Sequence, residues 1–187
     1  MNFKYKTKPY AHQEEALKRS FDKKNYAYFM EMGCGKSKVL LDNISWLNEN
    51  KKIDTAIIVA PKGVYMNWKN SEIPTHLHDD VDPNIYIWRA MANKKQKTEL
   101  MEGVKNRDKF RILLVNIESF ATTKAVKYLE SFVHRSNFLL AIDESTTIKN
   151  PKAKRTKALM MFGQSALYKR ILTGSPVTKS PLDLYTQ

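Results

Sequence analysis

The sequence has little cysteine and no long uninterrupted apolar stretch. Its one cysteine, Cys34, excludes an internal disulfide framework and fits a reducing compartment. No apolar run approaches the roughly 20 residues of a membrane-spanning helix, and the first ten residues lack the apolar centre of a signal peptide. We therefore expect a soluble intracellular protein without a membrane partner, in the cytoplasm or nucleoid, or in the host cytoplasm if the source is viral.

Acidic residues are outnumbered by basic ones. The chain has 19 Asp and Glu against 32 Lys and Arg, which gives a net charge of +13. This excess favours a polyanionic partner such as nucleic acid, although a lysine-rich genome would produce it without one. The 187 residues, 42% of them hydrophobic, are enough for one domain with a sizeable core. No repeat, low-complexity linker or composition break marks a second domain, so we expect one domain over residues 1–187.

Apolar runs alternate with helix-length segments along the chain. The runs are too continuous for half-exposed strands and indicate buried parallel strands. Strict alternation of strand and helix predicts an α/β fold of three layers, a mainly parallel sheet with helices on both faces. The predicted strands are 26–30, 55–60, 84–88, 111–116, 138–143 and 168–173, and the predicted helices are 11–22, 36–49, 94–105, 123–134 and 153–163.

A glycine turn, GCGKS, lies between the first predicted strand and the following helix. Gly33 and Gly35 permit backbone conformations that let successive N–H groups surround an anion at the helix N-terminus. Lys36 adds a mobile cation and Ser37 a hydroxyl that can bind Mg²⁺. The phosphate-loop pattern is G-x-x-x-x-G-K-[ST], and Met30 stands where that pattern has its first glycine. The alternative is a plain glycine turn before a helix.

An acidic pair follows another predicted strand, in FLLAIDES. Asp143, the first carboxylate after the apolar run, can hold Mg²⁺ through water, and Glu144 can polarise an attacking water. Such a pair alone commonly just ends a strand. Together with GCGKS it predicts a site for a nucleoside triphosphate and Mg²⁺.

Five segments in order resemble the motifs of one family, the N-terminal motor domain of superfamily 2 helicases and translocases, most closely its Swi/Snf-type branch. PYAHQEEAL resembles the glutamine motif, EMGCGKS resembles EMGLGKT, and IIVAPKGVYMNW is similar to the motif along the nucleic-acid backbone. DESTTIKN resembles the DEAH-x-IKN box, with Ser145 and Thr146 where many relatives have alanine and histidine. LTGSPVTKSPLDLY is similar to LTGTP with its continuation.

The resemblance implies a RecA-like phosphate-loop fold that uses ATP and Mg²⁺. It implies that Gln13 reads the adenine edge, that Thr173 and Ser175 couple the nucleotide state to the nucleic-acid groove, and that Pro61 and Lys62 lie against nucleic acid, with DNA the expected form. The resemblance also implies which residues bind and hydrolyse the nucleotide. The implied nucleotide-binding loop comprises Gly33, Cys34, Gly35, Lys36 and Ser37, and the implied catalytic residues are Lys36, Asp143 and Glu144.

The same resemblance implies a second RecA-like domain, which supplies arginines to the transferring phosphate. That domain is absent from this sequence, so we expect a truncated motor that is nearly inactive by itself. Two alternatives stay open: a catalytically silent scaffold that binds nucleotide or nucleic acid, and the motor part of a restriction or remodelling complex. Trp68 could stack on a nucleic-acid base, but a tryptophan on an amphipathic helix more often belongs to the core.

Overall fold

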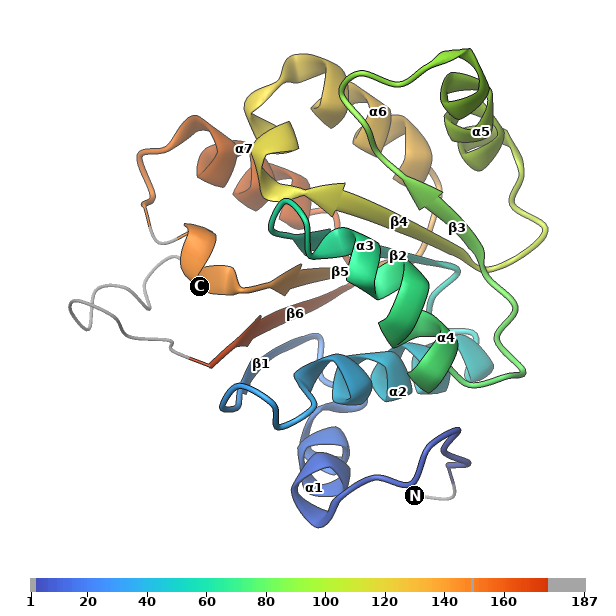
Figure 1. The fold of residues 1–187 in the computed structure, drawn as a ribbon, viewed down its shortest axis with the longest axis vertical. Coiled ribbons are helices and arrows are strands. Elements are labelled where there is room, and N and C mark those ends of the chain that lie inside the picture. The colour runs from blue at the N-terminus through green and yellow to red at the C-terminus, as the bar shows by residue number, and fades with distance from the viewer. Residues whose placement is uncertain (1–2, 149, 175–187) are drawn as a thin grey trace.

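A single parallel sheet of six strands forms the centre of the molecule. The computed structural model describes residues 3–148 and 150–174, and within them the strand order is β1-β6-β5-β2-β4-β3 (Figure 1). Every predicted strand is present, with shifts of one residue at both ends of β1 and at the end of β3. The strands are β1 (Asn25–Phe29), β2 (Thr55–Ala60), β3 (Asn84–Ile87), β4 (Arg111–Asn116), β5 (Phe138–Asp143) and β6 (Tyr168–Thr173).

The central strand β2 shows why the apolar runs are continuous. Successive side chains of a strand point to opposite faces of the sheet. Ala56 and Ile58 belong to the hydrophobic cluster on one face, whereas Ile57 and Val59 belong to the cluster on the other face. All six residues of β2 are buried, so both faces of the sheet must be covered.

Helices cover both faces and complete three layers, which confirms the predicted α/β class. One face carries α1, α2 and α4, and the other carries α5, α6 and α7 (Figure 1). In the described ranges, none of the helices combines the length and the apolar character needed to span a bilayer. The longer helices match the predicted segments and are α1 (Ala11–Ser20), α2 (Lys36–Glu49), α5 (Lys94–Lys105), α6 (Thr123–Val133) and α7 (Lys154–Gly163).

A helical segment between β2 and β3 was not among the predicted helices. It consists of α3 (Tyr65–Asn67), the π-helical turn η1 (Trp68–Glu72) and α4 (Ile73–His76). Pro74, near the start of α4, has no N–H to donate to the preceding turn, which favours a local change in the hydrogen-bond pattern. The sequence pattern of a regular helix is therefore interrupted. Two 3₁₀ turns, η2 (Ile117–Ala121) and η3 (Ser145–Ile148), follow β4 and β5.

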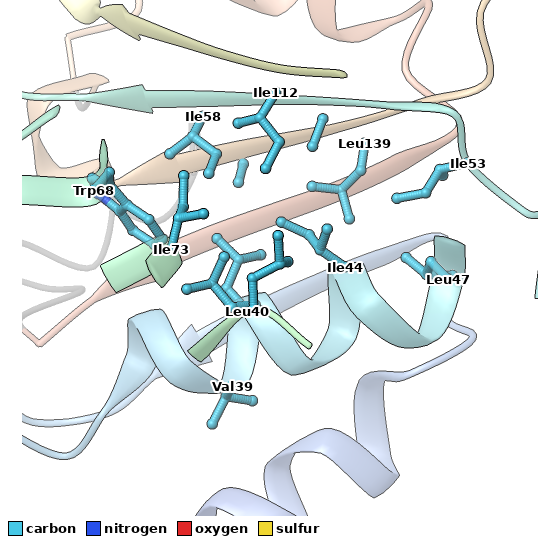
Figure 2. Packing of buried hydrophobic residues seen from close by; sticks show 14 of the residues in the cluster. Val39, Leu40, Ile44, Leu47, Ile53, Ile58, Trp68, Ile73, Ile112 and Leu139 are labelled. Atoms are coloured by element: carbon cyan, nitrogen blue, oxygen red, sulfur yellow. The ribbon is translucent and has the colours of Figure 1, made fainter. Parts of the chain in front are cut away.

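Helix α2 is buried on more than one side. Leu40, Ile44 and Leu47 pack toward the sheet, while Val39 points away from it on the side where α1 lies (Figure 2). All four side chains have no exposed surface. Truncating a buried leucine of this kind to alanine typically destabilises a protein by about 2–5 kcal/mol. The helix that follows the GCGKS loop is thus a firmly held support for that loop.

Candidate nucleotide site

The loop between β1 and α2 contains two glycines in the left-handed conformation. Gly33 has φ +79° and Gly35 has φ +78°, values that glycine adopts without steric cost. Gly35 is the N-cap of α2, and a Cβ at this position would lie 2.3 Å from Nε2 of Gln13. The first N–H groups of an α-helix have no partner within the helix and carry the positive end of its dipole. The loop therefore has the backbone geometry of an anion site.

Lys36 opens α2 and lies against this loop. Its Nζ donates to the carbonyl oxygens of Met30 at 3.0 Å and Glu31 at 3.1 Å, and the residue is only 9% exposed. Met30 contributes to this contact through its backbone, which any residue type can supply. This hydrogen bond therefore does not require a glycine at position 30. Ser37, the next residue of α2, is partly exposed.

Two side chains of α1 hold the loop from outside. Nε2 of Gln13 donates to the carbonyl oxygen of Cys34 at 3.1 Å, and Nε2 of His12 lies 3.0 Å from the same oxygen. The other end of the Gln13 amide accepts the backbone N–H of Tyr10 at 3.0 Å. The structure thus places Gln13 beside the loop. It adds His12, which the sequence pattern did not single out.

Asp143 and Glu144 lie at the same edge of the sheet as the loop. Asp143 is the last residue of β5, and the carboxyl ends of parallel strands meet at one edge. Glu144 has φ +50°, a left-handed conformation that is uncommon for a residue with a side chain. Its backbone N–H donates to Oδ1 of Asp143 at 3.0 Å. The two acids therefore form a tight turn directly after the strand.

The pKa of Asp143 depends on its burial and on nearby groups, among them Lys36. Burial raises the pKa of Asp143, and the nearby charge of Glu144 raises it further. A hydrogen bond from Trp68 and the positive charge of Lys36 oppose that shift. The lysine of one motif thus acts on the carboxylate of the other, although 107 positions separate them in the sequence.

Trp68 belongs to the core, and it also contacts the acidic pair. The residue is 1% exposed, which confirms its interpretation as a core side chain. Its indole Nε1 donates to Oδ2 of Asp143 at 3.0 Å. This contact could not be predicted from the sequence, because spacing along a chain carries no information on a hydrogen bond between residues 75 positions apart.

The predicted coupling residue Thr173 ends β6 and adjoins the loop. It pairs with Phe29 at the end of β1, and its carbonyl oxygen accepts the N–H of Met30 at 3.2 Å. Because the carbonyl of Met30 in turn accepts from Lys36, a continuous hydrogen-bonded path runs from β6 to the lysine. Ser175, the other predicted coupling residue, lies outside the described residues.

The predicted nucleic-acid residues Pro61 and Lys62 directly follow β2. The carbonyl oxygen of Pro61 accepts the N–H of Val64 at 3.0 Å, and Gly63 has φ +93°, so the segment forms a turn. Lys62 is exposed. The turn lies at the carboxyl edge of the sheet, on the same edge as the loop and the acidic pair.

The donor set at this edge fits a magnesium ion. Mg²⁺ prefers oxygen ligands and commonly takes only one or two of them from protein while keeping water and substrate phosphates. The Ser37 hydroxyl and the Asp143 carboxylate are oxygen donors of this kind. Their chemistry therefore suits the predicted cofactor.

The fold and the site are those of a parallel α/β domain in which a glycine loop precedes a helix and an acidic pair follows another strand. The family model described as "SNF2-related domain" matches residues 12–186. The chain therefore belongs to the SNF2-related domain family. This confirms the resemblance to the N-terminal motor domain of Swi/Snf-type helicases.

Two relatives with similar sequences agree with this family. The chain is 28% identical over 158 residues to "Probable ATP-dependent DNA helicase CHR12" of Arabidopsis thaliana, covering 83% of this chain and 13% of that protein. It is 34% identical over 157 residues to "SWI/SNF-related matrix-associated actin-dependent regulator of chromatin subfamily A-like protein 1" of Xenopus tropicalis, covering 84% of this chain and 14% of that protein.

The fold matches that of a solved ATPase core. "Sulfolobus solfataricus SWI2/SNF2 ATPase core in complex with dsDNA" superimposes with a TM-score of 0.75 at 18% identity, covering all of this chain and 36% of that one. This likeness confirms the RecA-like fold. The chain spans between 13% and 16% of the length of its first curated relatives.

Proposed function

We propose that the chain is the ATP-binding half of a nucleic-acid-dependent ATPase motor, which couples hydrolysis of Mg²⁺-bound ATP to movement on DNA. The observation that carries the proposal is the meeting of the Gly33–Ser37 loop with Asp143 and Glu144 at one edge of the sheet. Both motifs are needed for phosphoryl transfer, in which positioning and charge stabilisation supply nearly all of the catalysis. The family supports the proposal, because several relatives are named as ATP-dependent helicases.

Each side chain at this edge has a chemical role in the proposal. The backbone N–H groups of Gly35 and Lys36 bind phosphate oxygens, and the Lys36 ammonium exchanges its loop carbonyls for those oxygens. Ser37 and Asp143 hold Mg²⁺. The bound ion would neutralise charge that develops on the phosphates. Glu144 orients the attacking water and takes its proton.

The remaining predicted residues bind the other partners. Gln13 and Cys34 border the nucleotide, where the amide of Gln13 reads the adenine edge. Pro61 and Lys62 contact the DNA backbone, and the charge of +13 strengthens that binding. We expect the DNA affinity to be weak, insensitive to sequence and steeply reduced by salt, since it depends largely on counterion release.

Ligand-dependent stability tests the nucleotide site directly. Mg²⁺ with ADP should raise the unfolding temperature of the 187-residue chain, because a ligand that binds only the folded state stabilises it. Lys36→Ala should abolish this rise. Lys18→Ala is the control, since that lysine lies exposed on α1 and forms a surface ion pair with Glu14. Equal protection of both variants would contradict the assignment, as would alkylation of Cys34 at the same rate with and without ADP.

Turnover tests the role of the second domain. An arginine delivered from another domain raises turnover by about 10³–10⁵-fold in related phosphate-loop enzymes. We therefore propose that this chain needs a second RecA-like domain and hydrolyses ATP very slowly without it, with or without DNA. Extending it through that domain should give DNA-stimulated phosphate release, which Glu144→Gln should stop while nucleotide binding remains. Rapid DNA-stimulated release by the short chain would refute the two-domain account.

A further inference from the structure

We infer that Trp68 is a positioning residue that fixes the orientation of the Asp143 carboxylate. The two carboxylate oxygens have separate donors: Oδ2 accepts from the Trp68 indole and Oδ1 accepts from the backbone N–H of Glu144, each at 3.0 Å. A carboxylate held at both oxygens has one orientation available. The remaining lone pairs of those oxygens then keep a fixed direction.

The indole is itself held firmly. Trp68 is 1% exposed and lies near Ile73 in the cluster between α2 and the sheet (Figure 2). It also begins the π-helical turn η1. Such turns are rare in proteins, and those that occur are often found at functional sites. The side chain that donates to Asp143 therefore cannot readily rotate away.

Packing alone does not require this hydrogen bond. Trp88 is also buried, at 5% exposure, and its Nε1 has no hydrogen-bond partner among the described residues. The fold thus accommodates a buried indole without a polar partner. In contrast, the Trp68 indole meets one of the acids at the functional edge.

The left-handed conformation of Glu144 gives the contact a second use. Such a conformation costs on the order of 1–3 kcal/mol and persists only where surrounding contacts enforce it. The Glu144 N–H is bound to Asp143, and Asp143 is bound to Trp68, so the indole supports the turn that directs the Glu144 side chain.

This inference rests on the proposed function, because it concerns the carboxylate that would hold Mg²⁺ there. Groups that orient a metal ligand typically contribute 10- to 100-fold to metal affinity. Trp68→Phe keeps an aromatic ring in the core and removes the donor. It should therefore weaken the response to Mg²⁺ without removing the phosphate loop.

The test compares binding of a fluorescent ADP derivative with Mg²⁺ and with EDTA. In Trp68→Phe we expect the Mg²⁺-dependent gain in affinity to fall by about 10- to 100-fold, with the affinity in EDTA unchanged. Trp88→Phe is the matched control and should behave as the wild-type protein. An undiminished Mg²⁺ response in Trp68→Phe would overturn this inference alone, whereas absence of ADP binding by the wild-type protein would overturn the proposed function as well.

A second measurement does not depend on the folding of Trp68→Phe. The three indole N–H resonances of the ¹⁵N-labelled protein can be assigned with Trp46→Phe and Trp88→Phe. Asp143→Ala should shift the Trp68 resonance, and Mg²⁺ with ADP should shift it in the wild-type protein. A Trp68 resonance that responds to neither change would overturn the inference.

Discussion

The two edges of the sheet use buried positive charge in different ways. At the amino edge, the Arg111 guanidinium donates to the carbonyl oxygens of Gly103 and Phe132 and to the hydroxyls of Thr55 and Ser136. The four acceptors come from α5, α6, β2 and the segment before β5. Arg111 therefore ties the elements of that edge together.

At the carboxyl edge, the hydrogen bonds of Lys36 within the described residues go to neighbours in the sequence. Its Nζ donates to the carbonyl oxygens of Met30 and Glu31, which lie six and five residues before it. Nearby are two left-handed glycines and the left-handed Glu144. A charge satisfied by many distant groups stabilises a fold, whereas a charge held by a few exchangeable carbonyls is available for a ligand. We therefore expect the amino edge to contribute mainly to stability and the carboxyl edge to provide the binding site proposed above.

The largest expected effect is at the amino edge. Arg111→Leu leaves three buried acceptors and the partly buried Ser136 hydroxyl without their donor, so we expect the free energy of unfolding to fall by about 3–5 kcal/mol. Urea unfolding measures this change. Arg107→Leu is the control, because Arg107 is exposed and should change stability by less than about 0.5 kcal/mol. A small effect of Arg111→Leu would remove the basis of the comparison.

Breaking the buried ion pair on α2 should have the next largest effect on the free energy of unfolding. Lys38 Nζ donates to Asp42 Oδ2 at 2.7 Å, and both side chains are at most 5% exposed. Asp42→Leu leaves a buried ammonium unpaired and should lower the free energy of unfolding by about 3 kcal/mol. The double variant Lys38→Met, Asp42→Leu should recover most of that loss in urea unfolding. A double variant no more stable than the single one would show that the charge pair itself stabilises the helix.

The same pair predicts a dependence of stability on pH. Burial raises the pKa of Asp42 to about 6, because the effect of burial outweighs the opposing effects of the hydrogen bond and the charge of Lys38. Between pH 4 and 6 the folded protein therefore keeps a proton on Asp42 that the unfolded chain has released. The stability that this group contributes is present at low pH and is lost as the pH rises through 6. Its loss should amount to about 1 kcal/mol per pH unit in that window. This slope of stability against pH should disappear in the double variant. An unchanged slope would show that a group other than Asp42 causes it.

The smallest expected effect on stability is at the carboxyl edge. Lys36→Met removes two hydrogen bonds to loop carbonyls but also relieves the burial of a cation, so urea unfolding should change by less than about 1 kcal/mol. The same variant should lose the protection by Mg²⁺ and ADP, which Arg111→Leu should retain while folded. If Lys36→Met unfolds the protein as Arg111→Leu does, the two edges do not differ in the proposed way.

The regular elements of the fold could be predicted because their patterns are local. The apolar run 55–60 and the helix over 36–49 have the predicted bounds in β2 and α2. Residues 65–76 were missed because Pro74 and the π-helical turn interrupt the period of 3.6 residues on which recognition of a helix depends.

The strands, the main helices and the residue types of the candidate site follow from local patterns, since glycine, lysine and carboxylate chemistry can be recognised within short segments. Which of those segments meet depends on how the chain packs in three dimensions. The strand order places β6 between β1 and β5, so that Thr173 contacts the loop and Lys36 acts on Asp143. It also brings Trp68 to Asp143 and surrounds Arg111 with four acceptors. Such contacts join residues far apart in the chain, and they arise from the packing of the sheet rather than from any local pattern.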